Sequence, residues 1–421
     1  MAEKTNRTGL WIIGAWGGVA TTALVGLLNL QKKLVQPVGL TTELPEFSDI
    51  EMPAWSEFVP AGYEIRDFSF EKAANELIEQ RAMERSAVTP ILKELAELDT
   101  RIFPGFLANS GKVVENMADR KREENLTPRE TISAMQSDMK TFVAENQLSH
   151  LIVVNLMSTE PVCEYFSESE IEKLPEAEQI KRGREWNNWE AFRQLLDSSE
   201  KPPVPASTLY AVAALETGFD FVNFTPSLGA TPPALEQLAK QTSARFFGND
   251  GKTGETLMKS VLAPMFAHRN LRVMSWVGHN IFGNRDGVVL DDPHNKATKV
   301  TSKNHLLEQI LGYAPQTLVT IEYIKSMGDW KTAWDHIHFQ GFLGTPMTLQ
   351  FTWQGCDSLL AAPLVLDLVR LTELARRRNF TGRMDFLACF FKSPIRVEEQ
   401  SFVRQFEKLE DWLRDEKQFQ N

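Results

Sequence analysis

Residues 248–262, "GNDGKTGETLMKSVL", combine glycines, hydroxyls and a lysine in an order that suits anion binding. An apolar run precedes them and a helical pattern follows, so Thr253, Gly254, Glu255 and Thr256 form the expected first helical turn. Unpaired backbone amides at a helix start are a ready site for a phosphate group. The spacing is not that of a Walker loop, so nucleotide hydrolysis is not indicated. A well-capped surface helix is the alternative interpretation.

Four lysines stand in settings that suit anion binding or proton transfer. Lys299 and Lys303 are four residues apart and would share one helix face, where an anion between them would relieve their repulsion. A solvated basic face is the alternative for that pair. Lys331 lies in "GDWKTAWDH", and Lys392 follows an apolar, aromatic run that predicts a buried strand. A lysine at the end of a buried strand must be paired or have a lowered pKa, as proton transfer near neutral pH requires.

Two further polar groupings have both a chemical and a structural interpretation. Residues 279–287, "HNIFGNRDG", bring two amides, an imidazole and a carboxylate around glycines, and form either a site for sugar hydroxyls or a polar turn. His336 and His338 share one face of a predicted strand. Because a third ligand is lacking, a structural role is favoured over metal binding, and any metal requirement stays unknown.

The uncharged stretch at residues 9–30, "GLWIIGAWGGVATTALVGLLNL", must be classified before the fold is inferred. Gly14, Gly17 and Gly18 follow a β-type run, where they would break a membrane helix but suit a tight strand-to-helix turn. With Ala20 they form a G-x-x-G-x-x-A relative of the dinucleotide-binding fingerprint. An ordinary buried strand, turn and helix without a ligand is the alternative, and a membrane or export segment fits less well.

Bulk composition narrows the classes of function. A chain of 421 residues exceeds what one core usually supports, so two domains are expected. The net charge of -11 disfavours a broad surface for nucleic acid or for an anionic membrane. Cys163, Cys356 and Cys389 are widely spaced, which fits neither a disulfide framework nor a structural zinc site and favours a reducing cytoplasm. Charges interrupt the apolar segment 359–375, which predicts a buried helix of a water-soluble protein.

Further elements must position these residues. Short apolar strands at 151–156, 219–224 and 244–247 alternate with helical segments, which predicts a parallel α/β sheet. Strand-rich sequence dominates after residue 282. We therefore predict a Rossmann-like domain formed by residues 1–256 plus 357–421, interrupted by an α+β insert at residues 257–356.

Taken together, these segments resemble the inositol-3-phosphate synthase family, also called myo-inositol-1-phosphate synthases, which cyclise glucose 6-phosphate with bound NAD. Six blocks occur in the family's order. "GNDGKTGETLMKSVLAPMF" resembles G-D-D-x-K-S-G-Q-T, "GHNIFGNRDG" resembles S-Y-N-H-L-G-N-N-D-G, and "TKVTSKNHLL" resembles S-K-x-x-S-K. "MGDWKTAWD" is similar to V-G-D-S-K-x-A-x-D, "CDSLLAAPLVLDL" to E-D-S-L-L-A-x-P-x-x-x-D-L, and "FFKSP" to W-L-K-A-P. All four lysines fall on active-site lysine positions of the family.

The resemblance implies a role for each matching residue. The implied catalytic residues are Lys299, Lys331, Lys392, Asp286 and Asp357. The implied substrate-binding residues are Thr253, Gly254, Glu255, Thr256, Asn280, Asn284 and Lys303. The implied cofactor-binding residues are Gly14, Gly17, Gly18, Val19, Ala20, Glu64, Ile65, Ser158, Thr159, Asp250 and Thr253. Glu64 and Ile65 of "GYEIRD" match G-W-D-I, whose acid addresses the adenosine ribose.

Three departures from the family pattern bear on these roles. Trp16 and the spacing around Gly17 do not fit the family's G-x-G-G loop. Glu255 stands where Gln is expected, so its carboxylate must turn away from a bound phosphate. Residues 223–227, "NFTPS", resemble the shorter microbial form of the family.

The implied reaction is the cyclisation of D-glucose 6-phosphate to 1D-myo-inositol 3-phosphate by oxidation at C5, enolisation, intramolecular aldol closure and re-reduction. The resemblance also implies that the Rossmann-like domain binds NAD as cofactor and that the α+β insert serves catalysis and oligomerisation. It further implies a cytoplasmic homotetramer with no nucleic-acid or membrane partner. Two alternatives stay open. One is another NAD-dependent sugar-phosphate oxidoreductase or cyclase on the same scaffold, and the other is a non-catalytic NAD-binding protein.

Overall fold

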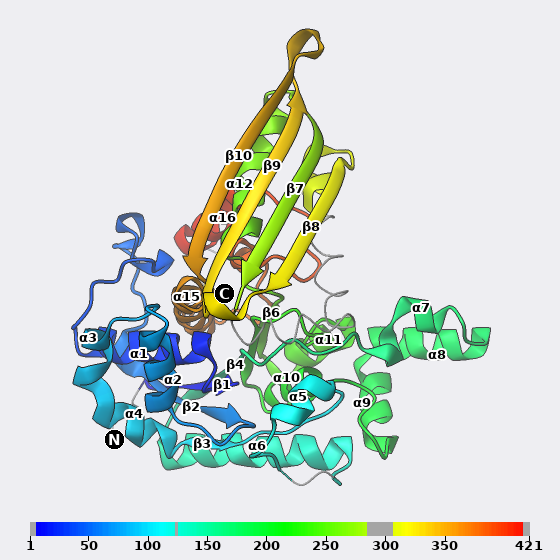
Figure 1. The fold of residues 1–421 in the computed structure, drawn as a ribbon. Helices are drawn as coiled ribbons and strands as arrows, with labels where there is room; N and C mark the ends of the chain where they lie inside the picture. Colours follow the sequence, from blue (N-terminus) through cyan, green and yellow to red (C-terminus); the bar gives the residue numbers. More distant parts are fainter. Residues whose placement is uncertain (1–5, 123–124, 284–305, 416–421) are drawn as a thin grey trace.

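Two β-sheets organise the computed structural model, which describes residues 6–122, 125–283 and 306–415 (Figure 1). The larger sheet has the strand order β11-β6-β5-β4-β1-β2-β3, and its paired strands all run parallel. Its strands are β1 (Thr8–Ile13), β2 (Phe58–Glu64), β3 (Ile102–Pro104), β4 (His150–Asn155), β5 (Asp220–Asn223), β6 (Arg245–Gly248) and β11 (Gly382–Arg383). The predicted Rossmann-like α/β class is confirmed.

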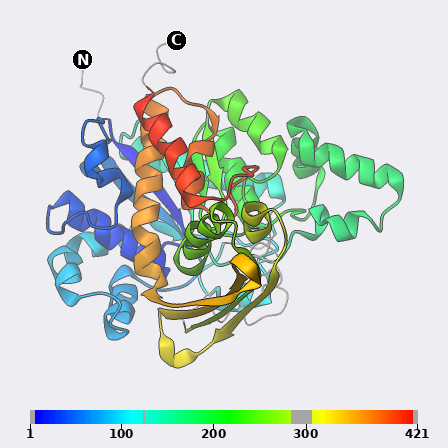
Figure 2. The same ribbon diagram turned by 90° about the horizontal axis from the view of Figure 1, so that it is seen from above.

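The helices surround this sheet and connect its strands. They are α1 (Gly18–Gln31), α2 (Phe70–Glu79), α3 (Arg85–Val88), α4 (Leu92–Asp99), α5 (Lys112–Met117), α6 (Pro128–Glu145), α7 (Glu168–Ile171), α8 (Glu176–Asn187), α9 (Trp189–Ser198), α10 (Ala206–Glu216), α11 (Pro233–Thr242), α12 (Gly254–His268), α15 (Asp357–Arg377) and α16 (Phe402–Arg414). Figures 1 and 2 show α7, α8 and α9 projecting to one side as an arm.

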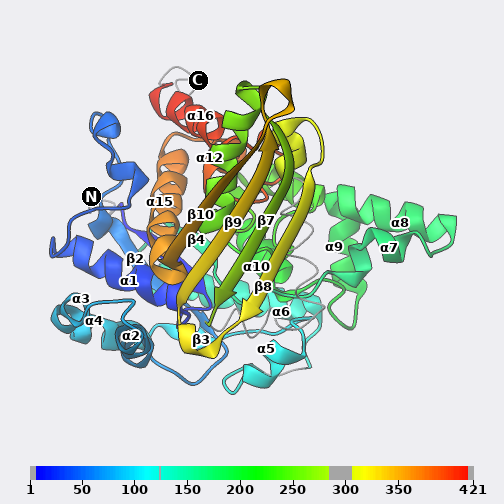
Figure 3. The ribbon, with the colours of Figure 1, turned by 45° about the horizontal axis from the view of Figure 1, so that its top comes forward.

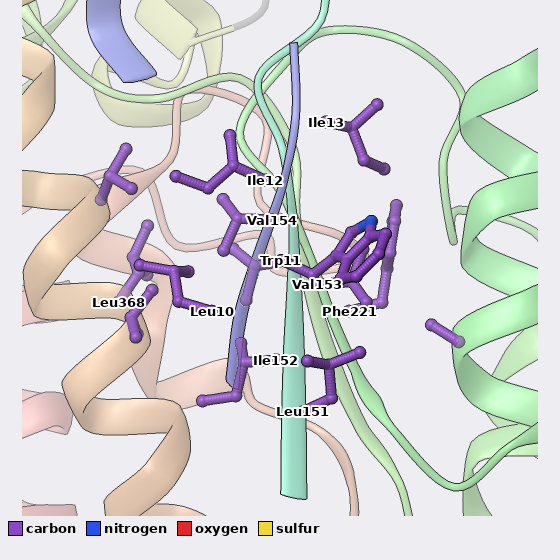
Figure 4. Packing of buried hydrophobic residues seen from close by; sticks show 14 of the residues in the cluster. Leu10, Trp11, Ile12, Ile13, Leu151, Ile152, Val153, Val154, Phe221 and Leu368 are labelled. Carbon is purple, nitrogen blue, oxygen red and sulfur yellow. The ribbon is translucent and has the colours of Figure 1, made fainter. Parts of the chain in front are cut away.

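The opening stretch forms strand β1 of the large sheet, the turn after it and the helix α1, as its glycines predict. Every residue of β1 is buried, because helices cover both faces of the sheet. Figure 4 shows the alternation, with Leu10 and Ile12 on the side of α15 and Trp11 and Ile13 on the opposite side. The helix α15 packs along α1, so an element from late in the chain completes the core around the first strand.

Two charged residues of α15 hold the proline-rich excursion that precedes β2. Asp367 accepts hydrogen bonds from the backbone amides of Thr41 and Thr42, at 2.7 and 2.9 Å. Arg370 donates to the carbonyl of Pro53 and pairs with Glu43 at 2.6 Å. These contacts explain how a helix that is mostly apolar in sequence contains buried charges.

The second sheet has the order β10-β9-β7-β8. Its strands are β7 (Arg272–Phe282), β8 (Gln316–Tyr323), β9 (Trp330–Gln340) and β10 (Pro346–Cys356). The inner face packs Trp276 and Ile337 against Phe266 of α12. Figure 3 shows the opposite face turned to the viewer, and no helix in the described ranges covers it. That outer face exposes Leu318 and Trp334, which are 51% and 44% exposed.

Some elements differ from the sequence-based expectations. The hydrophobic pattern of the sequence does not indicate the strands β2 and β3, because β2 contains a proline and β3 has only three residues. The apolar run before Lys392 is a 3-10 helix (Asp385–Phe390) rather than a strand, although it is buried as expected. The two strands β11 and β6 already close that edge of the sheet, so the run packs beneath them. The domain boundaries at residues 256/257 and 356/357 stay a prediction.

Candidate active site

A cavity of about 230 Å³ lies at the carboxyl edge of the parallel sheet, beside the turn after β1. Ligands of open α/β sheets bind at this edge. Eight of the predicted cofactor residues line the cavity. They are Gly14, Gly17, Gly18, Val19, Ala20, Glu64, Ile65 and Ser158.

The glycine turn is shaped for close approach to a ligand. Gly14 has φ +83°, and a Cβ there would lie 3.0 Å from the carbonyl oxygen of Leu156, so only glycine fits without strain. Its amide donates to the carbonyl of Tyr63, and Gly17 then caps α1. The first amides of α1 have no side-chain cap and border the cavity, which is the arrangement that attracts a phosphate.

The unexpected Trp16 does not block this turn. Its indole is 4% exposed and donates to Asp99 at 2.7 Å, away from the glycines. Its backbone amide donates to Glu64 at 2.9 Å. The spacing that departs from the family's loop is therefore accommodated by burying the tryptophan beneath the turn.

Three other predicted cofactor residues are not among the cavity-lining side chains: Thr159, Asp250 and Thr253. Thr159 is buried behind the end of β4. Asp250, with φ +60°, binds the ammonium of Lys392 at 3.0 Å, and the two backbones are also hydrogen-bonded. This buried pair meets the requirement that a lysine in an apolar setting has a partner.

The other described lysine of the predicted set is Lys331 at the start of β9. Its ammonium lies 3.9 Å from the carboxylate of Asp357, the first residue of α15, and 5.6 Å from the ring centre of Phe282. Its side chain is 17% exposed, so the charge is partly desolvated and available to a ligand from one side. Such a setting strengthens the attraction to an anion compared with open water.

The start of α12 has the geometry expected of an anion site. Thr253 is the N-cap without a side-chain hydrogen bond, and Gly254 has φ +54°. Glu255 turns inward, where its carboxylate lies 2.5 Å from Lys259 and accepts from Asn280 at 2.6 Å. Because its carboxylate is turned away, Glu255 presents only its backbone amide at the start of α12.

Two more predicted substrate residues complete this region. Thr256 is buried in the same turn, and Asn280 is 1% exposed on β7. The Oδ1 atom of Asn280 has no hydrogen-bond partner in the described ranges. Lys252, which the motif placed near the anion site, is instead buried and donates to Gln405 of α16 at 2.5 Å. Burial lowers the pKa of Lys252 to about 8.

Four predicted residues, Asn284, Asp286, Lys299 and Lys303, lie outside the described residues. Their implied roles stay predictions.

Asp329 is a cavity residue that was not among the predicted site residues. It is 5% exposed and accepts from the amide and hydroxyl of Ser358, at 3.0 and 2.9 Å. Burial raises the pKa of its carboxyl. A Cβ on Gly18 would lie 2.5 Å from the Ser358 hydroxyl, so the glycine turn and this aspartate are in close contact. The sequence feature that could have identified Asp329 is its position two residues before Lys331 in "MGDWK".

Neither a metal site nor a membrane helix emerges from the described residues. No group of three or more His, Cys, Asp or Glu side chains there is arranged to hold a metal ion. His336 and His338 lie on the outer face of the second sheet, each facing a polar residue of β10 across the ladder. No described helix is long and apolar enough to cross a bilayer.

The fold and the cavity define an α/β protein with a dinucleotide-type pocket, joined to a second sheet whose strand β9 directly follows the cavity residue Asp329. The sequence model of the myo-inositol-1-phosphate synthase family, named for its NAD-binding domain, matches residues 8–414. The chain therefore belongs to the myo-inositol-1-phosphate synthase family.

Individual relatives agree with this assignment. The chain is 32% identical over 409 residues to inositol-3-phosphate synthase 1 of Bacteroides thetaiotaomicron, covering 93% of this chain and 90% of the relative. It is 28% identical to the Rattus norvegicus enzyme of that name, covering 94% and 75%.

Solved structures share the fold. The inositol-3-phosphate synthase of Caenorhabditis elegans has a TM-score of 0.82 at 22% identity, covering 97% of this chain and 86% of that one. A myo-inositol-1-phosphate synthase-related protein of Thermotoga maritima has a TM-score of 0.75 at 23% identity, covering 97% and 98%.

Proposed function

We propose that the protein is an inositol-3-phosphate synthase, which cyclises D-glucose 6-phosphate to 1D-myo-inositol 3-phosphate. Family membership over nearly the whole chain supports this function. The observation that carries it is the contact between Gly18 and Ser358, since Ser358 also binds Asp329, two residues from Lys331. This contact brings the dinucleotide-type turn to Asp329, which directly precedes the strand that carries Lys331, and a reaction between a cofactor and a sugar phosphate requires such an approach.

We propose NAD as the cofactor of the cavity. The glycine turn and the uncapped start of α1 suit its pyrophosphate, and Glu64 at the end of β2 stands where Rossmann folds meet the adenosine ribose. Bound NAD would supply removal of hydride from C5 of the sugar and its return, so the overall reaction is not a net oxidation.

The protein's own residues would bind the sugar phosphate and stabilise charge. In this proposal the amides of Thr253 to Thr256 hold the phosphate group. The ammonium groups of Lys331 and Lys392 donate to the oxyanions that form during enolisation and aldol closure. A donor placed in advance at a developing oxyanion contributes about 3 kcal/mol to catalysis. Asp357 and Asp250 would orient these two lysines, since each already lies beside one of them.

Incubation of the purified protein with glucose 6-phosphate tests the function directly. We expect inositol phosphate, identified by NMR and mass spectrometry, with no net accumulation of NADH. Accumulation of NADH in step with product would instead identify an ordinary sugar-phosphate oxidoreductase. Absence of any product while NAD still binds would identify a non-catalytic NAD-binding protein.

We further propose that the protein works as a homotetramer whose contacts include the outer face of the second sheet. Exposed Trp334 and Leu318 on that face support this assembly, because large apolar groups on an uncovered sheet favour association. Sedimentation of Trp334→Glu tests it, with Val38→Glu as the control at an exposed apolar residue elsewhere. We expect only Trp334→Glu to yield smaller species.

We propose a cytoplasmic location. The three cysteines are all free, and two of them are buried, which suits a reducing compartment. Fractionation of cells that express a tagged chain would test this, and recovery with the membrane or the exterior would contradict it.

A further inference from the structure

The carboxylate at the ribose end of the cavity is already saturated by donors of its own chain. Glu64 is 3% exposed. One of its oxygens accepts from the Ile65 amide at 2.9 Å and from Nε of Arg66 at 3.1 Å. The other accepts from the Trp16 amide at 2.9 Å and from Nη2 of Arg66 at 2.8 Å. A carboxylate has about four acceptor positions, and these four donors fill them.

This saturation changes which hydrogen-bonding groups a bound ribose would contact. In NAD-binding folds the acid at this position accepts hydrogen bonds from the ribose hydroxyls. Here Glu64 can do so only by giving up one of the four donors. Arg66, by contrast, uses two of its five N–H groups on Glu64 and lines the same cavity, with its side chain 16% exposed. At the ribose end of the cavity, the polar groups available to a ligand are therefore mostly hydrogen-bond donors.

The neighbouring charged side chains do not remove the hydrogen-bond donors that Arg66 presents. Arg66 and Glu64 form a neutral pair, and the guanidinium lies 5.5 Å from the ring centre of Phe68, which fixes its plane. Glu76 lines the cavity as well, and burial raises the pKa of its carboxyl although the charge of Arg66 acts against this. Arg120 lies 5.1 Å from the ring centre of Trp16, so a second guanidinium stands behind the turn.

We propose that Arg66 makes this site accept a 2′-phosphate on the adenosine ribose, so that the protein binds NADP about as well as NAD. A guanidinium recognises a phosphate ester through charge-assisted hydrogen bonds, whereas a 2′-hydroxyl gains only a neutral acceptor contact. The inference rests on the proposed NAD site and concerns its selectivity.

Calorimetric titration of the purified, nucleotide-free protein with NAD and with NADP tests the proposal without relying on turnover. We expect the two dissociation constants to lie within tenfold of each other. In Arg66→Gln the affinity for NADP should fall at least tenfold relative to that for NAD. Arg66→Lys, which keeps the charge, should retain part of the NADP affinity. Arg85→Gln is the matched control, because Arg85 is exposed and does not line the cavity.

The outcomes separate this inference from the function it rests on. NAD binding with NADP more than tenfold weaker in the unaltered protein overturns the role of Arg66 and leaves the proposed function standing. The role of Arg66 is also overturned if Arg66→Gln shifts the ratio of the two affinities by less than tenfold. If neither nucleotide binds, the cofactor assignment fails and the inference falls with it. If Arg66→Gln does not fold, the comparison of NAD and NADP in the unaltered protein and in Arg66→Lys decides.

Discussion

The two ends of the parallel sheet both bury charged side chains, yet they use them differently. At the amino end, His150, Asp220 and Arg245 are the first residues of β4, β5 and β6. The carboxylate of Asp220 lies 2.8 Å from Nε2 of His150 and 2.7 Å from Nε of Arg245. Burial alone would raise the pKa of Asp220, but these two partners lower it.

At the carboxyl end, two of the buried acids meet neutral donors. Beyond β4, Glu160 is 1% exposed and accepts from the amide and hydroxyl of Ser207. Burial raises the pKa of Glu160 to about 7. Asp329 is likewise held by neutral donors beside the cavity. The comparison teaches that buried charge alone does not mark a site. The ion pairs of Asp220 hold the scaffold together, whereas Asp329 and the fully paired Glu64 both line the ligand cavity.

The largest effect is expected at the amino end. Asp220→Asn would leave Arg245 and His150 without their anion, and removing one partner of a buried ion pair costs about 3 to 5 kcal/mol. Urea unfolding would measure this loss. The surviving folded protein should keep its turnover number, and a lowered turnover number would break the division between the two ends.

At the carboxyl end we expect the reverse pattern for Lys392→Ala. Loss of a preplaced donor should lower kcat by about 10²- to 10³-fold. Product formation from glucose 6-phosphate measures this, and unchanged NAD binding by calorimetry serves as the check on the cofactor site. Lys173→Ala, just beyond the short helix α7, is the control, since its pair with Glu170 lies in solvent. Full activity of Lys392→Ala would exclude this lysine from catalysis.

The two buried acids predict opposite pH dependences of stability. Glu160 binds its proton more tightly in the folded state, so its contribution is present below about pH 4.5 and is lost as pH rises through about 7. Glu160→Gln should therefore remove a decline on the order of 3 kcal/mol between these values. The contribution of Asp220, whose pKa is lowered, is instead present above about pH 4 and lost in acid. Unfolding free energies between pH 3 and 8 would reveal both limbs, and a shared direction would contradict the assignment.

The smallest effect is expected from a single methyl group. Gly18→Ala would bring a Cβ within 2.5 Å of the Ser358 hydroxyl and displace the contact between the glycine turn and the start of α15. We expect about tenfold weaker NAD binding, which corresponds to about 1.4 kcal/mol. In α8, Gly183→Ala is the matched control, because nothing lies within 4 Å of its added Cβ. That variant should bind NAD normally and gain about 0.5 to 1 kcal/mol of stability.

Local patterns predicted the parts of the fold that depend on neighbouring residues. The run before Gly14 and the glycines after it defined β1 and α1. The start of α6 is equally local, because Thr127 and Glu130 of "TPRE" form a capping box and bond reciprocally. The spacing of Gly14, Gly17, Gly18 and Ala20 indicated their part of the cavity, whereas Glu64, Ile65 and Ser158 followed only from the family resemblance.

Contacts between distant segments could not be predicted from the sequence. The saturation of Glu64 joins Trp16 to a residue 48 positions away, and Ser358 lies 29 positions from Asp329. Such pairings depend on which strands become neighbours. The apolar run before Lys392 suited a buried strand and a buried 3-10 helix equally, and only the place already taken by β11 decides between them.

The packing of α15 along α1 has a consequence for how the chain is made. The ribosome releases the first strand and helix long before it releases their partner, and translation adds about 5 to 20 residues per second. For roughly tens of seconds the apolar side of the nascent amino-terminal unit has no permanent cover. Newborn chains of this protein therefore expose this apolar surface until the late helix emerges and docks.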